Sequence, residues 1–81
     1  MKAIVTVGLK PGVLDVQGKA VASALKDLGF GAVHDARVGK RIELELDDGL
    51  DLAAAEAQVK AMCEKLLANT VIESYSVEIA R

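Results

Sequence analysis

An alternating stretch in the middle of the chain, Val33 to Asp47, constrains the fold more than any other part of the sequence. It places apolar residues on even positions and charged residues on odd ones: Ala36, Val38, Ile42, Leu44 and Leu46 against Asp35, Arg37, Arg41, Glu43 and Glu45. A period of two residues is typical of a β-strand with one face on a core and the other toward water or a partner.

Gly39 lies inside this stretch, where a hairpin is the alternative to one long strand. A two-residue turn at Gly39 and Lys40 would pair Val38 with Arg41 and so place apolar side chains opposite charged ones. A three-residue loop needs its glycine at the third position, which here is Lys40. The alternation therefore favours one strand, kinked or bulged at Gly39. Because strands usually have about five or six residues, a strand this long can extend beyond its own sheet, and it then needs another chain beside it.

The sequence before this strand predicts a strand and a helix. Lys2 to Leu9 alternates as a strand, and the turn Lys10-Pro11-Gly12 ends it. Asp15 is a suitable N-cap for a helix that runs to about Leu28 and stops at Gly29. The expected apolar face of this helix, with two small residues for close approach to a sheet, carries Leu14, Val21, Leu25, Leu28, Ala20 and Ala24.

The sequence after the long strand predicts a second helix and a last strand. Asp51 caps the helix, and Asn69 is suited to the left-handed conformation that would end it. The last strand is expected from Val71 to Ile79. An apolar stripe of period 3.6 marks the face of the helix toward the sheet: Leu52, Ala55, Val59, Met62, Cys63 and Leu66.

The element order β-α-β-α-β predicts an α+β fold in a single domain, residues 1–81. Two helices on one face of a small sheet give a two-layer sandwich, close to a ferredoxin-like unit whose middle hairpin is straightened into the long strand. With Phe30 and Tyr75 as its only aromatic residues, the core is thin, and a dimer formed through the sheet would add burial.

Charge and composition exclude several classes of protein. The net charge is −2 with acids and bases mixed, and no basic block or aromatic platform is present to bind nucleic acid. The apolar runs are shorter than the ~18–20 residues of a membrane-spanning helix, and we expect no signal peptide. One cysteine allows no internal disulfide, and a cytoplasmic protein is expected.

The chemically active side chains form no recognisable catalytic, cofactor-binding or metal site. His34 and Asp35 are neighbours on a strand, so they point to opposite faces and do not orient each other. Cys63 falls on or beside the apolar stripe, where a buried thiol is inert, and one cysteine with one histidine cannot fill a tetrahedral metal site. The glycine-containing loops at Lys10-Pro11-Gly12-Val13 and Gly29-Phe30-Gly31 match no phosphate-binding fingerprint.

The basic cluster around Gly39 is the most unusual polar feature. Arg37, Lys40 and Arg41 fit either a solvated strand edge or a surface that faces a partner, because exposed edges are either protected by charge or paired. The residues by themselves indicate a small oligomeric binding or assembly module without an active site.

Three blocks of the sequence resemble the PurS family, the small subunit of phosphoribosylformylglycinamidine synthase. They are VLDVQGKAV (Val13–Val21), DARVGKRIEL (Asp35–Leu44) and MCEKLLANTVIESY (Met62–Tyr75), and the resemblance covers essentially the whole chain. Many members end in an acidic tail, whereas this sequence ends in Ala80-Arg81.

The resemblance implies a non-catalytic subunit of an ATP-dependent carbon-nitrogen ligase in purine biosynthesis, with glutamine as the amido donor. The complex makes formylglycinamidine ribonucleotide from formylglycinamide ribonucleotide. A large synthetase subunit binds ATP and substrate, a glutaminase subunit releases ammonia, and the small subunit is expected to form a homodimer or higher oligomer that bridges the two. Arg37, Gly39, Lys40 and Arg41 are then predicted to lie at or near a subunit boundary.

Two other classes remain open. A regulatory ligand-binding module of the amino-acid-sensing type shares the α+β layout, but it needs a glycine-rich loop at a dimer interface, for which Gly29-Phe30-Gly31 is a weak candidate. A small stand-alone enzyme is disfavoured because no pair of titratable groups converges by spacing.

Overall fold

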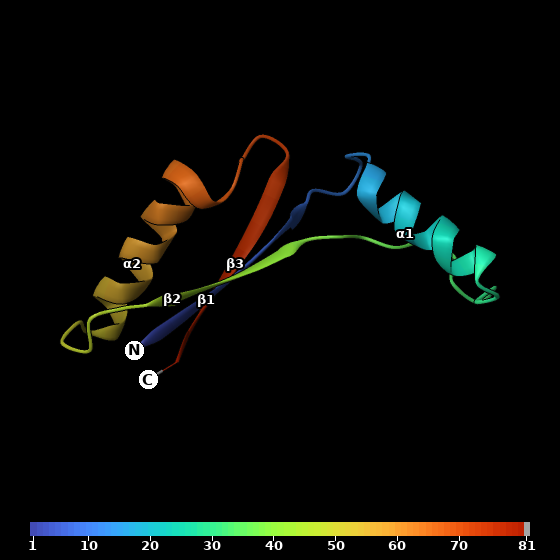
Figure 1. The fold of residues 1–81 in the computed structure, drawn as a ribbon. Coiled ribbons are helices and arrows are strands. Elements are labelled where there is room, and N and C mark those ends of the chain that lie inside the picture. Colours follow the sequence, from blue (N-terminus) through green and yellow to red (C-terminus); the bar gives the residue numbers. More distant parts are fainter. Residues whose placement is uncertain (81) are drawn as a thin grey trace.

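A computed structural model describes residues 1–80 of the chain (Figure 1). The three strands form one antiparallel sheet in the order β2 (Lys40–Glu45), β1 (Lys2–Leu9) and β3 (Glu73–Ala80). Both the α+β class and the predicted order of strands and helices are confirmed. In chain order the elements are β1 (Lys2–Leu9), α1 (Val16–Asp27), β2 (Lys40–Glu45), α2 (Leu52–Met62), the π-helical turn η1 (Cys63–Leu67) and β3 (Glu73–Ala80).

The core lies between the sheet and α2, which covers one face of it. The middle strand β1 buries Ala3, Val5 and Val7, and α2 with η1 contributes Val59 and Cys63. Register keeps the rows through Ala3 and Val5 apolar on this face, since Val5 lies opposite Ile42 of β2 and Val77 of β3. The largest fully buried side chains are valines and the cysteine, so the core is as thin as the composition predicts. Partly buried residues complete it: Ile42, Leu44, Leu46, Met62, Leu67, Tyr75, Val77 and Ile79.

Helix α1 stands beyond the end of the sheet, away from α2, and gives the molecule an elongated shape of 50 × 26 × 14 Å (Figure 1). This corrects the expectation that both helices cover one face of the sheet. The cause is the path of the connections: after β1 ends at Leu9, the chain continues outward, and it returns from α1 to β2 in an extended conformation. Leu14 and Leu28, expected to face the sheet, are 61% and 74% exposed.

The long strand is only partly hydrogen-bonded within the chain. The chain runs through Gly39 without turning back, as predicted (Figure 1), but strand pairing covers Lys40–Glu45 in place of the expected Val33 to Asp47. The β1–β2 ladder ends at the pair Val7 and Lys40, and β1, which ends at Leu9, has no residues beside which the stretch before Val38 could lie. Strand β2 therefore lies at the edge of the sheet, with an extended, unpaired segment before it.

The end of the second helix also differs from the prediction. The backbone N–H of Ala68 donates to the carbonyl of Cys63 at 3.0 Å, which closes the π-helical turn, and Ala68 itself is extended. Among residues 1–80, no residue other than glycine has a positive φ, so the left-handed conformation expected of Asn69 is wrong. Its side-chain oxygen instead accepts from the N–H of Val71 in a turn, and β3 begins two residues later than predicted, at Glu73.

Candidate functional site

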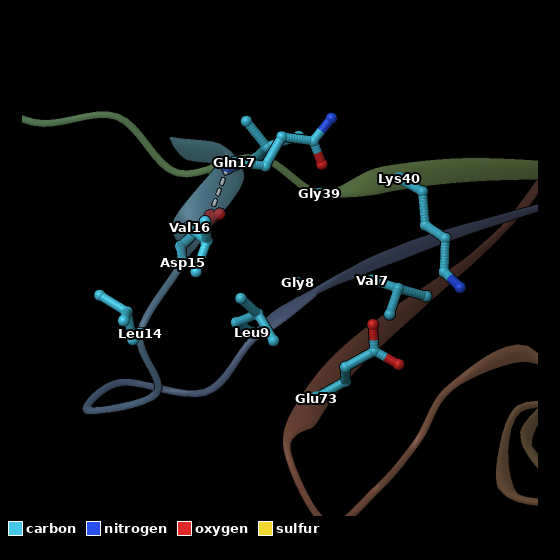
Figure 2. Close-up of a pocket in the computed structure, with 11 residues that line it drawn as sticks. Val7, Gly8, Leu9, Leu14, Asp15, Val16, Gln17, Gly39, Lys40 and Glu73 are labelled. Atoms are coloured by element: carbon cyan, nitrogen blue, oxygen red, sulfur yellow. Dashed lines mark hydrogen bonds between the residues drawn. The ribbon is translucent and has the colours of Figure 1, made fainter. Parts of the chain in front are cut away.

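A polar cluster joins the two connections of α1 where they leave the sheet. We call it the arm junction; it consists of the outgoing segment Lys10–Asp15 and the returning segment Arg37–Gly39. Asp15 is its centre and is 5% exposed. One carboxylate oxygen accepts from the N–H of Gly18 at 2.6 Å, and the other accepts from the N–H of Val38 at 2.7 Å, the dashed line of Figure 2.

These contacts favour the ionised form of the Asp15 carboxyl. The N–H groups of Val38 and Gly18 hold its pKa below the usual value of 3.8, and the nearby charge of Arg37 acts in the same direction. Because ionised carboxylates make stronger hydrogen bonds than neutral acceptors, the charge stabilises both the start of α1 and the approach of the returning segment. The sequence predicts the capping role of Asp15 and misses the contact with Val38, for which local sequence carries no signal.

Arg37 adds a second set of contacts across the arm junction. Its guanidinium donates from Nη1 to the carbonyl of Val13 at 3.0 Å and from Nη2 to the carbonyl of Lys10 at 3.1 Å. The guanidinium that the sequence suggests for a partner surface is thus bonded to its own chain. Lys10 in turn donates through Nζ to the carbonyl of Thr70 at 2.7 Å, which ties the outgoing segment to the turn before β3.

Two glycines allow the segments to approach one another closely. A Cβ on Gly39 would lie 2.5 Å from the carbonyl oxygen of Val7, and a Cβ on Gly18 would overlap the carbonyl oxygen of Ala36. Both obstacles are backbone atoms, so a side chain at either position requires the main chain to move. The contact at Gly18 explains a glycine in the first turn of a helix, where propensity alone disfavours it.

An open hollow of about 390 Å³ lies beside the arm junction, between the end of β1 and the start of α1 (Figure 2). Apolar side chains of Val7, Leu9 and Leu14 line part of it, and the charged side chains of Lys40 and Glu73 lie at the sheet end. Because Lys40 is opposite Val7 in the ladder, it lies on the face of the sheet that α2 covers further along.

The four residues predicted to lie near a subunit boundary do not form one patch in the structure. Arg37 belongs to the arm junction, Gly39 packs on Val7, and Lys40 lies at the hollow. Arg41 lies on the opposite face of the sheet, where its Nη1 donates to Glu43 at 2.6 Å and holds the pKa of that carboxyl below its usual value, with help from Lys2.

The remaining chemical candidates lie apart from one another. His34 and Asp35 are exposed in the stretch just before the returning segment. Cys63 is fully buried, and burial, reinforced by the charge of Glu64, raises the pKa of its thiol. Within residues 1–80, no group of three or more potential ligands gathers to hold a metal ion. In the same range, no helix has the length and apolar character needed to cross a bilayer.

Helix α1 presents apolar side chains that no other part of residues 1–80 covers. Val16 is 71% exposed, Leu28 is 74% exposed, and Phe30 follows at 59%. A second pair, Leu66 and Val71, is exposed in η1 and in the turn before β3, at the end of the sheet where β3 begins beside Leu9. Large apolar side chains gathered on one exposed element are typical of a surface that meets another chain.

The sheet, its single covering helix and the outlying α1 define a small α+β protein of ferredoxin-like type. The sequence model of the PurS family, described as phosphoribosylformylglycinamidine (FGAM) synthase, matches residues 2–81. The chain belongs to the PurS family, whose members are subunits of FGAM synthase in purine biosynthesis.

Relatives and solved structures agree with this membership. The PurS subunit of FGAM synthase from Synechocystis is 52% identical over 73 residues, which cover 90% of this chain and 72% of that protein. The Bacillus subtilis subunit is 49% identical over 81 residues, covering 96% and 90%.

Three solved structures match the fold as well. The crystal structure of B. subtilis PurS has a TM-score of 0.86 at 48% identity and covers 99% of this chain and 98% of that one. PurS from Methanocaldococcus jannaschii has a TM-score of 0.89 at 35% identity, covering 99% and 95%. A chain in the structure of PurLQS from Thermotoga maritima has a TM-score of 0.82 at 34% identity, covering 95% and 93%.

Proposed function

We propose that this chain is the non-catalytic assembly subunit of FGAM synthase, acting in the cytoplasm. In this role it holds the glutaminase subunit on the large synthetase subunit, so that ammonia released from glutamine reaches the ATP-dependent step without escaping into water. The observation that carries the proposal is the match between this fold and a chain of PurLQS from T. maritima, at a TM-score of 0.82 over 95% of the residues.

The assembly unit that we propose is a homodimer in which two copies exchange their α1 arms. Within the described residues, the extended segment before Lys40 has no strand paired with it, and β2 has a free edge. Two such segments can pair antiparallel around Gly39, with the segment of one copy beside β2 of the other. Unlike the hairpin, this register pairs even positions with even ones, so that Ala36 meets Ile42 of the second copy.

The exchange would also cover the exposed face of α1. Each sheet would gain a fourth strand and a second helix from the other copy, which completes the ferredoxin-like layout that one chain leaves open. Burial of Leu28 and Phe30 against a partner would add hydrophobic stabilisation, at about 25 cal/mol per Å² of apolar surface, to a core that is thin by itself.

The proposed docking role is tested by reconstituting the complex with its synthetase and glutaminase subunits. Reversing the charges at the strand edge, with Lys40→Glu and Arg41→Glu together, is expected to abolish glutamine-dependent synthesis and to spare ammonia-dependent synthesis. The reason is that only the first reaction needs ammonia to pass between subunits. Arg37 is left unchanged in this variant because its guanidinium bonds to the backbone of the arm junction, which the test is meant to leave intact.

A matched control is Lys60→Glu on the exposed side of α2, which is expected to leave both reactions unchanged. Equal loss of both reactions in the double variant, or no loss of either, contradicts the docking role. Co-purification of the unaltered chain with both partner subunits, with and without glutamine and Mg-ADP, tests the assembly itself.

A further inference from the structure

The two helices of this chain begin with the same kind of cap but use it differently. Asp51, the N-cap of α2, accepts one hydrogen bond, from the N–H of Ala54 at 2.7 Å. Asp15, the N-cap of α1, caps Gly18 with one oxygen and holds Val38, 23 residues away, with the other. A cap needs a single acceptor, so the contact with Val38 serves something other than the helix.

That contact joins the two connections of α1 to each other. With the two guanidinium bonds of Arg37, it makes three hydrogen bonds between the outgoing and the returning segments of the arm junction. The close contacts of Gly18 with the carbonyl of Ala36 and of Gly39 with the carbonyl of Val7 hold the returning chain against the start of α1 and the end of β1. Two extended connections that would otherwise move independently are therefore held as one unit, and α1 points in one direction (Figure 1).

We propose that Asp15 and Arg37 form a lock that fixes α1 outward and so prepares it for exchange with a second copy of this chain. The inference rests on the exchanged homodimer proposed above and adds the residues that determine it. For α1 to close onto its own sheet, the returning segment would have to turn back at Gly39, which requires breaking the contact between Asp15 and Val38.

The lock also lowers the cost of association. A helix on two loose connections loses conformational freedom when it binds a partner, whereas a helix already held in the binding orientation has lost that freedom beforehand. Without the lock, the dimer is expected to form in the same way but to dissociate more readily.

The test is Asp15→Ser, because serine keeps the cap of α1 and is too short to hold Val38 as well. The matched control is Asp51→Ser, which makes the same change at a cap with no long-range contact. The dimer dissociation constant of the full chain is measured by sedimentation equilibrium over a dilution series. Asp15→Ser is expected to raise it at least about tenfold, in line with the loss of a charge-assisted hydrogen bond, and Asp51→Ser to leave it within about twofold.

A second variant and a second measurement keep the test decisive if Asp15→Ser does not fold. Arg37→Met keeps the aliphatic stem, removes both guanidinium bonds and is also expected to weaken the dimer. Hydrogen exchange at the N–H of Val38 reports the lock directly and is expected to quicken in Asp15→Ser. Faster exchange at Val38 with an unchanged dissociation constant overturns the lock and leaves the dimer standing. An unaltered chain that stays monomeric up to high micromolar concentration overturns the exchanged dimer itself.

Discussion

The carboxylate of Asp15 and the backbone N–H of Val38 meet at 2.7 Å although 23 residues of chain separate them. The whole of α1 lies between these two residues, so the contact closes a loop that contains the helix and leaves the sheet outside it. A single buried side chain thereby joins the two connections of α1 to each other.

The stability of the arm junction is expected to fall in acid. The pKa of the Asp15 carboxyl lies below 3.8 in the folded chain because the N–H groups of Val38 and Gly18 favour the charged form. A group whose pKa is lowered by folding stabilises the fold above its unfolded pKa, and this contribution is lost as the pH falls through the folded pKa. Unfolding of the unaltered chain should therefore become easier as the pH falls below about 4.

Asp15→Asn provides the comparison, since asparagine caps a helix but does not ionise. Urea unfolding followed by circular dichroism at several pH values should show a smaller acid-dependent loss in this variant than in the unaltered chain. An NMR titration of the Asp15 carboxyl carbon gives the folded pKa directly. A midpoint at or above 3.8 contradicts the geometry described for this carboxylate.

Gly39→Ala is expected to destabilise the chain, by about 1–3 kcal/mol, the usual cost of adding an atom to a filled space. The added Cβ would lie 2.5 Å from the carbonyl oxygen of Val7, and neither backbone can move without disturbing the β1–β2 ladder. Gly8→Ala is the matched control, because an added Cβ there meets nothing within 4 Å. Equal free energies of unfolding for the two variants, measured in urea, would show that the approach of β2 to β1 is looser than described.

The sequence predicts those parts of this fold that local patterns determine. Asp15 and Asp51 begin the two helices as expected, β1 has the predicted bounds, and the even positions from Ile42 to Leu46 face the core. Each of these depends on residues within a turn or a strand of one another. The predicted apolar face of α1 is wrong, because Gly18 and Ala22 are the buried residues of this helix, whereas Leu14, Val21 and Leu28 are exposed. A period of 3.6 does not say which face a neighbouring segment covers.

The parts that the sequence did not predict depend on contacts between distant residues. Paired strand was expected from Val33, but pairing needs a neighbour, and β1 ends before it can supply one. The sequence predicts Arg37 at or near a subunit boundary because its charge is visible there, whereas the carbonyls that it binds, of Val13 and Lys10, carry no sequence signal. The role of Gly18 could be found only from its position against Ala36.

Cys63 is expected to react only when the chain unfolds. Its side chain is fully buried against the sheet, and burial raises the pKa of the thiol, so little of the reactive thiolate is present at neutral pH. Labelling with a thiol-reactive disulfide reagent should be slow in buffer and complete within the mixing time in denaturant. Fast labelling of the native chain would show that the thiol is accessible and would contradict the buried position of Cys63.

Val59→Ala tests the same core by shortening a buried side chain. Val59 is fully buried between α2 and the sheet, and loss of its two methyl groups should cost about 1.5–3 kcal/mol of unfolding free energy. Val71→Ala removes the same atoms from a side chain that is 81% exposed and should change the free energy by less than about 0.5 kcal/mol. Similar losses in the two variants would contradict a core centred on α2.

Leu28→Ser separates the stability of one chain from that of the proposed dimer. Leu28 is 74% exposed at the end of α1, so serine removes almost no contact within the chain. In an exchanged dimer the same side chain is covered by the second copy, and its loss should raise the dissociation constant by about tenfold or more, since burial of one leucine side chain is worth about 1.5–3 kcal/mol.

The control for this variant is Leu66→Ser, which makes the same change at a leucine that is 83% exposed and lies outside α1. Sedimentation equilibrium should show a weakened dimer for Leu28→Ser and an unchanged dimer for Leu66→Ser. In urea, the unfolding midpoints of the two variants should converge to one value as the protein concentration is lowered. If both substitutions weaken the dimer equally, the contact between copies is not made through α1. If neither does, the uncovered face of this helix has a different partner, and the two copies meet along the strands only.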